Sequence, residues 1–491
     1  MSCNKILEAL KETKFPDIKI VTKDDDRSTY DQARRIANLR FDLFPCAIAY
    51  CSDHEQVASF LSWCVDHKFP FRVRSGGHQH LGMCSADDSI IIDITGIDQI
   101  EYLDNGRQAW IPAGKTNGDV YLELKDKDLI FAGGGCGNVR VGGLVQGGGW
   151  SPSGSTFGMA CDTVSAARII LANGQYVTAK AGNEYENLFW AIRGGGGGNF
   201  GIATHFLMDL FPLDETQKTF SLRWEAKYME AITTQWMELV SDPNTSDKLT
   251  INCRLSVCDE ITINKAPVAL SGIYYGEQSK LDGYLNLFKK IGPPLVQPEG
   301  FLEKKSFDRL AHLKIGRLVQ TSNAPVSTCD GPHPHVVASL FPATRDFKLL
   351  AQLVANRILN TTESEAVNQY ISLMHMGGKI ATLDPAATAF PYRNKYFVMQ
   401  LQEWWSDPAD PRQQEYLDWM AAYLEELRYP NSAAPMTEGA FINFPQPNFE
   451  GLDKEQLLEM YYAGNLPRLI DVKTEFDRDN AFDFPLSIPV S

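Results

Sequence analysis

Two short segments of the chain combine glycines with one chemically reactive side chain. Arg74-Ser75-Gly76-Gly77-His78 follows a stretch with the two-residue periodicity of a strand, and Cys136 lies within GGGCGNVRVGG. On its own, the first segment is explained equally well by a turn that ends in a surface histidine. The ten cysteines include no CxxC pair, and only Cys136 has glycine-rich surroundings. Any chemistry at these residues therefore depends on what the glycines do.

The glycines are unevenly distributed along the chain. Many of the 38 fall between residues 133 and 158, and residues 194–198 are five glycines in a row. A hydrophobic core gains nothing from this, because glycine adds no buried area and costs backbone entropy. Glycine serves instead where φ is positive or where the backbone approaches a bulky group. Clustering at this density favours the second use, with backbone N–H groups lining a large anionic ligand.

Three familiar binding motifs do not account for these glycines. A GxGxxG at residues 196–201 follows a helical pattern and precedes a strand pattern, the reverse of a dinucleotide-binding fingerprint. GKT at residues 114–116 lacks the first glycine of a P-loop, because Ala109 stands there. There is no HExxH, and the nine histidines show no metal-ligand spacing. We therefore predict no metal site.

Hydrophobic periodicity divides the chain into three zones. From about residue 35 to 210, strands such as FRVRSG, SIIIDITG and QAWIPAG alternate with helices such as HEQVASFLSWCVDHK. From about 211 to 430, strands such as LTINCRLSVCD and KYFVMQLQEWW alternate with amphipathic helices such as FKLLAQLVANRIL and QQEYLDWMAAYLEEL. The remaining residues contain a short apolar run, GAFINF, and a helical pattern, EQLLEMYYAGNLPRLIDVKTEF.

Composition excludes several classes of function. The 491 residues carry a formal net charge of −15, so phosphate backbones would repel the chain and nucleic acid is a poor candidate partner. No apolar run approaches the roughly 20 residues that span a bilayer, and we expect no membrane association. The charged N-terminus is not a secretory signal. The scattered cysteines fit neither a disulfide scaffold nor a zinc cluster. We therefore expect a cytoplasmic protein.

The two reactive segments occur in a fixed order with two others, NLFWAIRGGGGGNFGI and YYAGNLPRLIDVKTEFDRDNAF. Together they resemble the FAD-linked oxidases of the vanillyl-alcohol oxidase superfamily, in the berberine-bridge-enzyme-like branch. The resemblance implies an α+β fold in which a two-part FAD-binding domain encloses an inserted substrate domain of an antiparallel sheet and helices. The expected parts are an N-terminal extension (1–34), the FAD-binding domain (35–210), the substrate-binding domain (211–430) and a C-terminal segment that returns to the FAD-binding domain (431–491).

The same resemblance implies a bicovalently bound FAD. The histidine of RSGGH is the family's attachment point to the flavin 8-methyl carbon, and the cysteine of the glycine-rich loop forms a thioether to flavin C6. These are His78 and Cys136 here. Two tethers would fix the flavin and raise its potential, which favours two-electron oxidation of an alcohol. The other expected FAD contacts are Arg74, Ser75, Gly76, Gly77, Gly135, Val139, Gly142, Gly143, Gly147, Gly148, Asn199, Gly201, Ile202 and Asn465.

The chain departs from the family pattern at its proton-handling residues. Two residues after the linked histidine, relatives usually carry a tyrosine, and this chain carries His80. The aYxNY-type strand that supplies a tyrosine in many relatives reads AFINF here, so Phe441 and Phe444 cannot take a proton. We therefore expect His80 to act as the base, because an imidazole titrates near neutral pH. The alternative is that His80 only fills the tyrosine's space. Tyr370 and Glu403 are the next candidates.

Two classes of function follow from the resemblance. The first is an oxidase of a hydroxyl-bearing carbohydrate or secondary metabolite, a small-molecule substrate, with O2 as the second substrate. Val139 favours an oxidase over a dehydrogenase, because a small residue near this place goes with oxygen access in the family. The second is a flavoprotein of the same scaffold that catalyses a cyclisation or isomerisation without net oxidation, and the loss of both tyrosines motivates it. Reduction of the flavin by a substrate in the absence of air distinguishes them.

Overall fold

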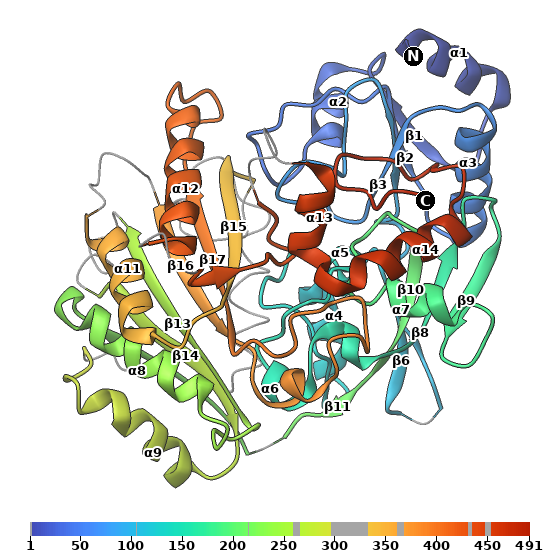
Figure 1. Ribbon diagram of the computed structural model, residues 1–491. Coiled ribbons are helices and arrows are strands. Elements are labelled where there is room, and N and C mark those ends of the chain that lie inside the picture. Colours follow the sequence, from blue (N-terminus) through green and yellow to red (C-terminus); the bar gives the residue numbers. More distant parts are fainter. Residues whose placement is uncertain are drawn as a thin grey trace.

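The computed structural model describes residues 2–104, 106–214, 216–258, 266–295, 332–360, 368–430, 435–446 and 453–491. Two large hydrophobic cores organise them (Figure 1). The first core takes residues from Cys3 to Leu210 and again from Ala440 to Ile488, with Ala389 between. The second takes residues from Phe220 to Met436. We call these the two-segment unit and the inserted unit. The fold is α+β, and the chain leaves the first core and returns to it.

The two-segment unit begins with a four-stranded sheet of order β1-β2-β4-β3. β2 (Ala47–Tyr50), β4 (Ile90–Asp93) and β3 (Phe71–Arg74) run parallel, and β1 (Lys19–Thr22) pairs antiparallel with β2. Parallel strands need crossover connections, and α3 (His54–Asp66) provides one between β2 and β3. The Asp53 side chain caps this helix by accepting from the backbone N–H of Gln56 at 2.7 Å. β3 is therefore an edge strand of this sheet, and the residues that follow Arg74 continue from it.

A second sheet of order β5-β6-β10-β8-β9 completes this unit. Its strands are β5 (Glu101–Tyr102), β6 (Gln108–Pro112), β8 (Val164–Ile170), β9 (Tyr176–Lys180) and β10 (Ile202–Asp209). The run of glycines lies between α7 (Glu186–Ala191) and β10, so a helix precedes it and a strand follows. This order confirms the rejection of a dinucleotide-binding fingerprint. The shorter elements are α2 (Arg27–Arg34), α4 (Asn117–Lys125), β7 (Leu129–Ile130), α5 (Val141–Gln146), α6 (Gly154–Phe157) and β11 (Phe211–Pro212).

The inserted unit is one antiparallel sheet of order β12-β14-β13-β16-β17-β15-β18. Its strands are β12 (Gln217–Trp224), β13 (Leu249–Cys258), β14 (Val268–Tyr275), β15 (His335–Pro342), β16 (Asn368–His375), β17 (Phe397–Trp404) and β18 (Thr437–Glu438). The helices α8 (Met229–Ser241), α9 (Gln278–Lys289), α11 (Phe347–Asn360) and α12 (Gln413–Arg428) pack on one face (Figure 1).

Alternation along the strands gives this sheet one apolar and one polar face. On β17, Met399 and Leu401 belong to the core under the helices, whereas Gln400, Gln402 and Trp404 face the other way. The following residue, Trp405, is again in the core. Side chains alternate between the two faces of a strand, so Gln400 and Gln402 are presented to the two-segment unit.

The C-terminal segment packs on the first core (Figure 1). α13 (Lys454–Tyr462) and α14 (Leu466–Phe476) are separated by a short break at residues 463–465. Tyr461, Tyr462, Leu466 and Leu469 are buried in the first core, as the apolar pattern of this segment requires. The GAFINF run is not a strand. Residues 439–444 form a turn in which Phe444 N–H donates to the Phe441 carbonyl at 2.7 Å.

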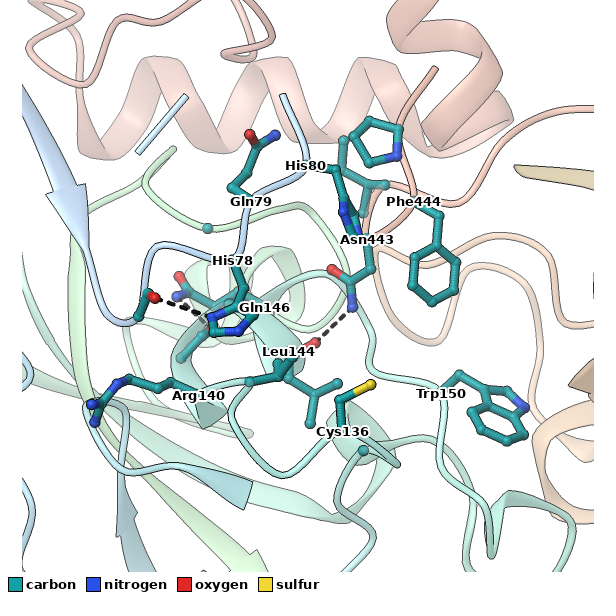
Figure 2. A pocket seen from close by; sticks show the side chains of 18 of the residues that line it. His78, Gln79, His80, Cys136, Arg140, Leu144, Gln146, Trp150, Asn443 and Phe444 are labelled. Atoms are coloured by element: carbon teal, nitrogen blue, oxygen red, sulfur yellow. Dashed lines mark hydrogen bonds between the residues drawn. The ribbon is translucent and has the colours of Figure 1, made fainter. Parts of the chain in front are cut away.

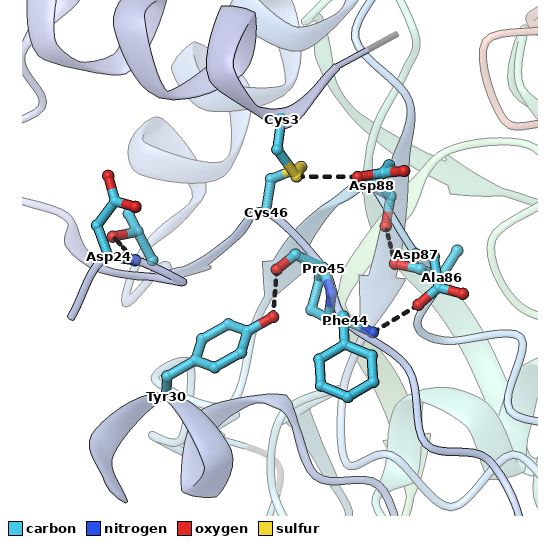
Figure 3. Close-up of a disulfide and its surroundings, with 11 residues drawn as sticks. Cys3, Asp24, Tyr30, Phe44, Pro45, Cys46, Ala86, Asp87 and Asp88 are labelled. Carbon is cyan, nitrogen blue, oxygen red and sulfur yellow. Dashed lines mark hydrogen bonds between the residues drawn. A yellow bond between two sulfur atoms is a disulfide. The ribbon is translucent and has the colours of Figure 1, made fainter. Parts of the chain in front are cut away.

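The N-terminal residues belong to the first core and are not an appendage to it. Cys3 and Ile6 of α1 (Cys3–Thr13) are buried there, and β1 joins the first sheet. A disulfide between Cys3 and Cys46, with Cα atoms 5.3 Å apart, ties α1 to the residue before β2 (Figure 3). The sequence reading that found no disulfide role for the cysteines misses this bond. Structural disulfides are rare in the reducing cytosol, so the bond speaks against the expected cytoplasmic location.

One loop of the inserted unit reaches back to the two-segment unit. The residues between β16 and β17 include Arg393, whose guanidinium forms two bonds of 2.7 and 2.8 Å to the Asp162 carboxylate. Both side chains are almost fully buried, and Trp190 donates to the Ala386 carbonyl of the same loop at 2.8 Å.

No helix in the described part of the chain is long and apolar enough to cross a membrane.

Candidate active site

A cavity of about 770 Å³ lies between the two units. Its walls come from the loop after β3, the loops before and after α5, the glycine run before β10, the C-terminal segment and the polar face of the inserted sheet (Figure 2). Of the predicted site residues, the following line it: Ser75, Gly76, Gly77, His78, His80, Gly135, Cys136, Val139, Gly142, Gly143, Asn199, Gly201, Ile202 and Tyr370. Four sequence segments far apart in the chain are thus brought together.

Arg74 stands behind the cavity wall and supports it. Its Nε donates to Asp93 Oδ2 at 2.6 Å, and both side chains are nearly fully buried. Asp93 lies at the end of β4, next to β3, and its other oxygen accepts from the backbone N–H of Thr95 at 2.9 Å. The charge of Arg74 is therefore paired inside the protein and its side chain does not line the cavity, and its predicted contact with FAD stays a prediction. The pair fixes the loop in which Gly77 has a φ of +72°.

His78 and Cys136 enter the same cavity from two different loops (Figure 2). The His78 Nδ1 lies 3.1 Å from the Gly76 carbonyl oxygen, which orients the ring. Cys136 forms no disulfide, and the Asn117 side chain donates to its carbonyl at 3.2 Å. Both side chains are partly exposed to the cavity. The arrangement therefore presents an imidazole and a thiol to one ligand.

The glycines leave room that side chains would fill. A Cβ built at Gly143 meets no atom within 4 Å, and one at Gly198 meets only the Phe484 ring at 4.0 Å. Both residues line the cavity, so a larger residue at either would project into it. Exposed backbone together with an imidazole and a thiol fits a long anionic group with a flat ring system, such as FAD.

Three predicted contacts lie outside the cavity. The Cβ position of Gly147 is occupied by the Asn443 side chain, and that of Gly148 approaches Met159 and Phe441. These glycines therefore allow close packing of protein side chains against the backbone. Asn465 donates to the carbonyls of Pro385, Thr388 and Ala389 at 2.8 to 3.4 Å, which holds the loop before β17. None of the three lines the cavity, and their predicted contacts with the cofactor stay predictions.

His80 forms a pair with a histidine from the inserted unit. Its Nδ1 lies 2.9 Å from the Nε2 of His335, the first residue of β15. The Nδ1 of His335 lies 2.8 Å from the His333 carbonyl, so this nitrogen carries the proton and its Nε2 is an acceptor. His80 must then donate through Nδ1, which leaves the lone pair of its Nε2 available.

Asn38 clamps the two histidines together. Its side-chain amide donates to the backbone carbonyls of His80 at 2.7 Å and of His335 at 3.0 Å. Its carbonyl oxygen accepts from the His335 N–H at 3.1 Å. Asn38 is fully buried, and these three bonds connect both units at the cavity.

Both histidines are uncharged at neutral pH. Burial, together with the neighbouring His78, lowers the pKa of His80 to about 4. Burial and the neighbouring His80 hold the pKa of His335 well below its ordinary value. The pair therefore keeps one fixed tautomer, with an unprotonated Nε2 on His80, at any pH above about 4.

Tyr370 lies in a polar cluster on the inserted sheet. Its hydroxyl donates to Gln402 Oε1 at 2.6 Å, and Trp404 Nε1 donates to the same oxygen at 3.0 Å. Trp404 also stacks on His335, with ring centroids 4.0 Å apart. Glu403 lies between Gln402 and Trp404, on the opposite, helix-covered face of the strand, and does not line the cavity, so its catalytic role stays a prediction that the cavity does not support.

Sequence reasoning missed His335, Asn38 and Gln402. His335 is 255 residues from His80, and nothing in its local sequence marks it. The alternation of β17 did contain a signal for Gln402, since it shares a strand face with Trp404. Arg140 also lines the cavity, with its aliphatic stem against Gly76, and donates to the Gly114 carbonyl.

Comparison with known proteins identifies the ligand class. A family model described as FAD binding domain matches residues 45–180, and one described as berberine and berberine like matches residues 440–489. An uncharacterized FAD-linked oxidoreductase of Bacillus subtilis, YgaK, is 27% identical over 483 residues, covering 96% of each chain. Reticuline oxidase of Eschscholzia californica is 26% identical over 470 residues, covering 91% of this chain and 83% of that protein.

Solved structures show the same fold. Chitooligosaccharide oxidase has a TM-score of 0.81 at 20% identity, with all of both chains covered. A glycopeptide hexose oxidase complexed with teicoplanin has a TM-score of 0.78 at 25% identity, covering 96% of this chain and 98% of that one. The two family models cover the cavity's glycine-rich loop and its C-terminal wall, and the relatives match along nearly the whole chain. The protein therefore belongs to the berberine-bridge-enzyme-like family of FAD-linked oxidoreductases.

Proposed function

We propose that the protein is an oxidase of a hydroxyl-bearing carbohydrate or secondary metabolite, with O2 as the final acceptor. Bound FAD supplies a two-electron acceptor for hydride, and in an oxidase it is reoxidised by O2. The observation that carries the proposal is the unprotonated His80 Nε2 in the same cavity as His78 and Cys136. Val139, which lines the cavity, is small enough to favour access of O2.

His80 takes the hydroxyl proton of the substrate in this proposal. When the carbon of an alcohol gives up a hydride, its hydroxyl proton must leave as well, and a carbonyl remains. Nε2 of His80 accepts that proton, while Nδ1 keeps its hydrogen bond to His335. Phe444 lines the cavity beside His80, with ring centroids 6.1 Å apart, and Phe441 is buried. Neither phenylalanine offers an alternative base.

Anaerobic mixing tests the proposed reaction. The purified protein is combined without oxygen with a panel of sugars and of aromatic and alkaloid alcohols, and the visible absorption of the flavin is followed. Bleaching by a panel member, and return of colour with H2O2 when air is admitted, are expected. Conversion of a panel member without bleaching would replace the proposal with cyclisation or isomerisation on the same scaffold.

Covalent attachment of FAD is expected at both His78 and Cys136. Protein denatured in acid should stay yellow in the pellet, because two bonds hold the cofactor. His78→Ala and Cys136→Ala should each retain it through the remaining bond, and the double variant should release it. Mass spectrometry of flavin peptides assigns each link. Release of all FAD from the unmodified protein would contradict bicovalent attachment.

Replacement of His335 should affect the rate through His80 alone. His335→Leu removes the acceptor that fixes the His80 tautomer, so we expect kcat to fall roughly 10-fold, the value of about one hydrogen bond, with little change in KM. His335→Gln supplies a side-chain oxygen as acceptor and should restore most of the rate. Equal loss in both variants would mean that His335 acts only as a packing residue.

A further inference from the structure

The inserted unit contributes one charged side chain to the cavity wall. Among the described residues of this unit that line the cavity, none is an aspartate or a glutamate, and Arg254 on β13 is the one arginine or lysine. Its neighbours there offer hydroxyl and amide groups, including Ser221, Asn252, Ser372 and Gln400. A charged group of a ligand on this wall would therefore meet a cation.

Arg254 has no acidic partner among the described residues. No carboxylate in the described part of the chain lies within salt-bridge distance of its guanidinium. The guanidinium carbon lies 3.7 Å from the centre of the Tyr370 ring, and Tyr370 is held in turn by Gln402. Stacking fixes the plane of the guanidinium but leaves the N–H groups along its edge for another acceptor.

A second arginine lies in register with the first. Arg223 on β12 and Arg254 on β13 both pair with Ala269 on the strand between them, β14. Residues in register share a face, and two strand spacings separate the backbones by about 10 Å. Ala269, which lies between the two arginines, has a short side chain. Burial and the nearby charge of Arg254 lower the pKa of Arg223, as expected for two cations without an acid.

We propose that Arg254 binds a carboxylate of the substrate and that Arg223 adds a second positive charge behind it. The proposal rests on the proposed function of the same cavity and narrows it to hydroxy acids. A planar guanidinium with a free edge pairs with a carboxylate through two parallel hydrogen bonds.

The strand order places this carboxylate away from the reacting carbon. β13, which carries Arg254, is separated from β15, which carries His335, by β16 and β17. Three strand spacings correspond to about 14 Å between the backbones, part of which the side chains span. The substrate therefore presents its hydroxyl to His80 and its carboxylate to Arg254, with a sugar or aromatic ring between them.

Matched pairs of anion and neutral isostere test the proposal. D-glucuronate is compared with D-glucuronamide, and benzoate with benzamide, by calorimetry on the flavin-loaded protein at one ionic strength. We expect each anion to bind roughly 10- to 100-fold more tightly than its amide, the usual weight of a charge-assisted hydrogen-bond pair. Binding is measured without turnover, so a protein that oxidises no alcohol still gives an answer.

Three variants test whether Arg254 causes the preference for the anion over the amide. Arg254→Gln should remove the preference for the anion and leave the amide's affinity unchanged, whereas Arg254→Lys, which keeps the charge, should retain part of it. Lys280→Gln removes an exposed charge on α9 of the same unit and should change neither. Equal affinity for anion and amide, no binding of either anion at millimolar concentration, or a preference that survives in Arg254→Gln would overturn the proposal.

Discussion

His80→Ala should lower the rate of flavin reduction by roughly 10²–10⁴-fold, the usual weight of a general base. The variant lacks the unprotonated Nε2, and Phe444, which lines the cavity beside His80, cannot replace it. Stopped-flow absorption of the flavin under anaerobic conditions measures this step separately from reoxidation. Both covalent links should remain, because His78 and Cys136 are untouched.

The dependence of the flavin reduction rate on pH tests the same role of His80 in a second way. His80 works as a base only when uncharged, so the rate should fall as the pH drops through its pKa. Burial moves that point from the ordinary 6.5 to about 4. The rate of the unmodified protein, measured in brief pH jumps, should therefore hold well below pH 6.5, and the acidic fall should vanish in His80→Ala.

A matched control is available in the same chain. His205 on β10 is also partly buried with a pKa lowered to about 4, but it lies outside the cavity. His205→Ala should leave the reduction rate and its acidic fall unchanged. If His80→Ala reduces its flavin at nearly the normal rate, His80 only fills the tyrosine's place, and Tyr370 becomes the next residue to test.

Asp162→Ala should destabilise the protein by about 3–5 kcal/mol, the cost of leaving one member of a buried ion pair uncompensated. Arg393 is fully buried, and its two bonds to Asp162 join the loop before β17 to the two-segment unit. The midpoint of denaturant unfolding measures the loss. The double variant Asp162→Ala/Arg393→Met should recover much of it, because it removes the buried charge as well.

An exposed ion pair of the same unit serves as the comparison. Lys395 and Glu438 form a salt bridge in which the Glu438 side chain is 45% exposed. Surface pairs contribute at most about 1 kcal/mol, so Glu438→Ala should shift the midpoint little. A loss of similar size in both variants would show that the buried pair is no more important than a surface one.

Local patterns in the sequence were sufficient for the elements and for most of the cavity wall. Period-two and helical patterns predicted β3, β13, β17 and α12, because hydrophobic residues recur along each with the period of its secondary structure. The predicted positions of His78, Cys136 and Gly143 on one wall followed from the order of four segments that resemble the family. Their roles toward FAD remain predictions.

Contacts between distant parts of the chain could not be predicted from the sequence. The side chains of Arg74 and Asn465 suit a ligand, but both bind protein groups that only the fold brings near. The partner of His80 comes from a strand of the other unit, and the bond between Cys3 and Cys46 joins residues 43 apart. No periodicity or spacing encodes such pairs.

The cavity wall combines residues that the ribosome adds at very different times, and this limits when the cavity can form. His78 is made early, whereas Phe484 and Leu486 on the same wall follow about 400 residues later. A ribosome that adds roughly 5–20 residues per second needs on the order of tens of seconds to cover that interval. Until then one side of the cavity does not exist. Capture of FAD in the complete cavity therefore follows the synthesis of Phe484 and Leu486, and until then the glycine-rich loops lack this cover.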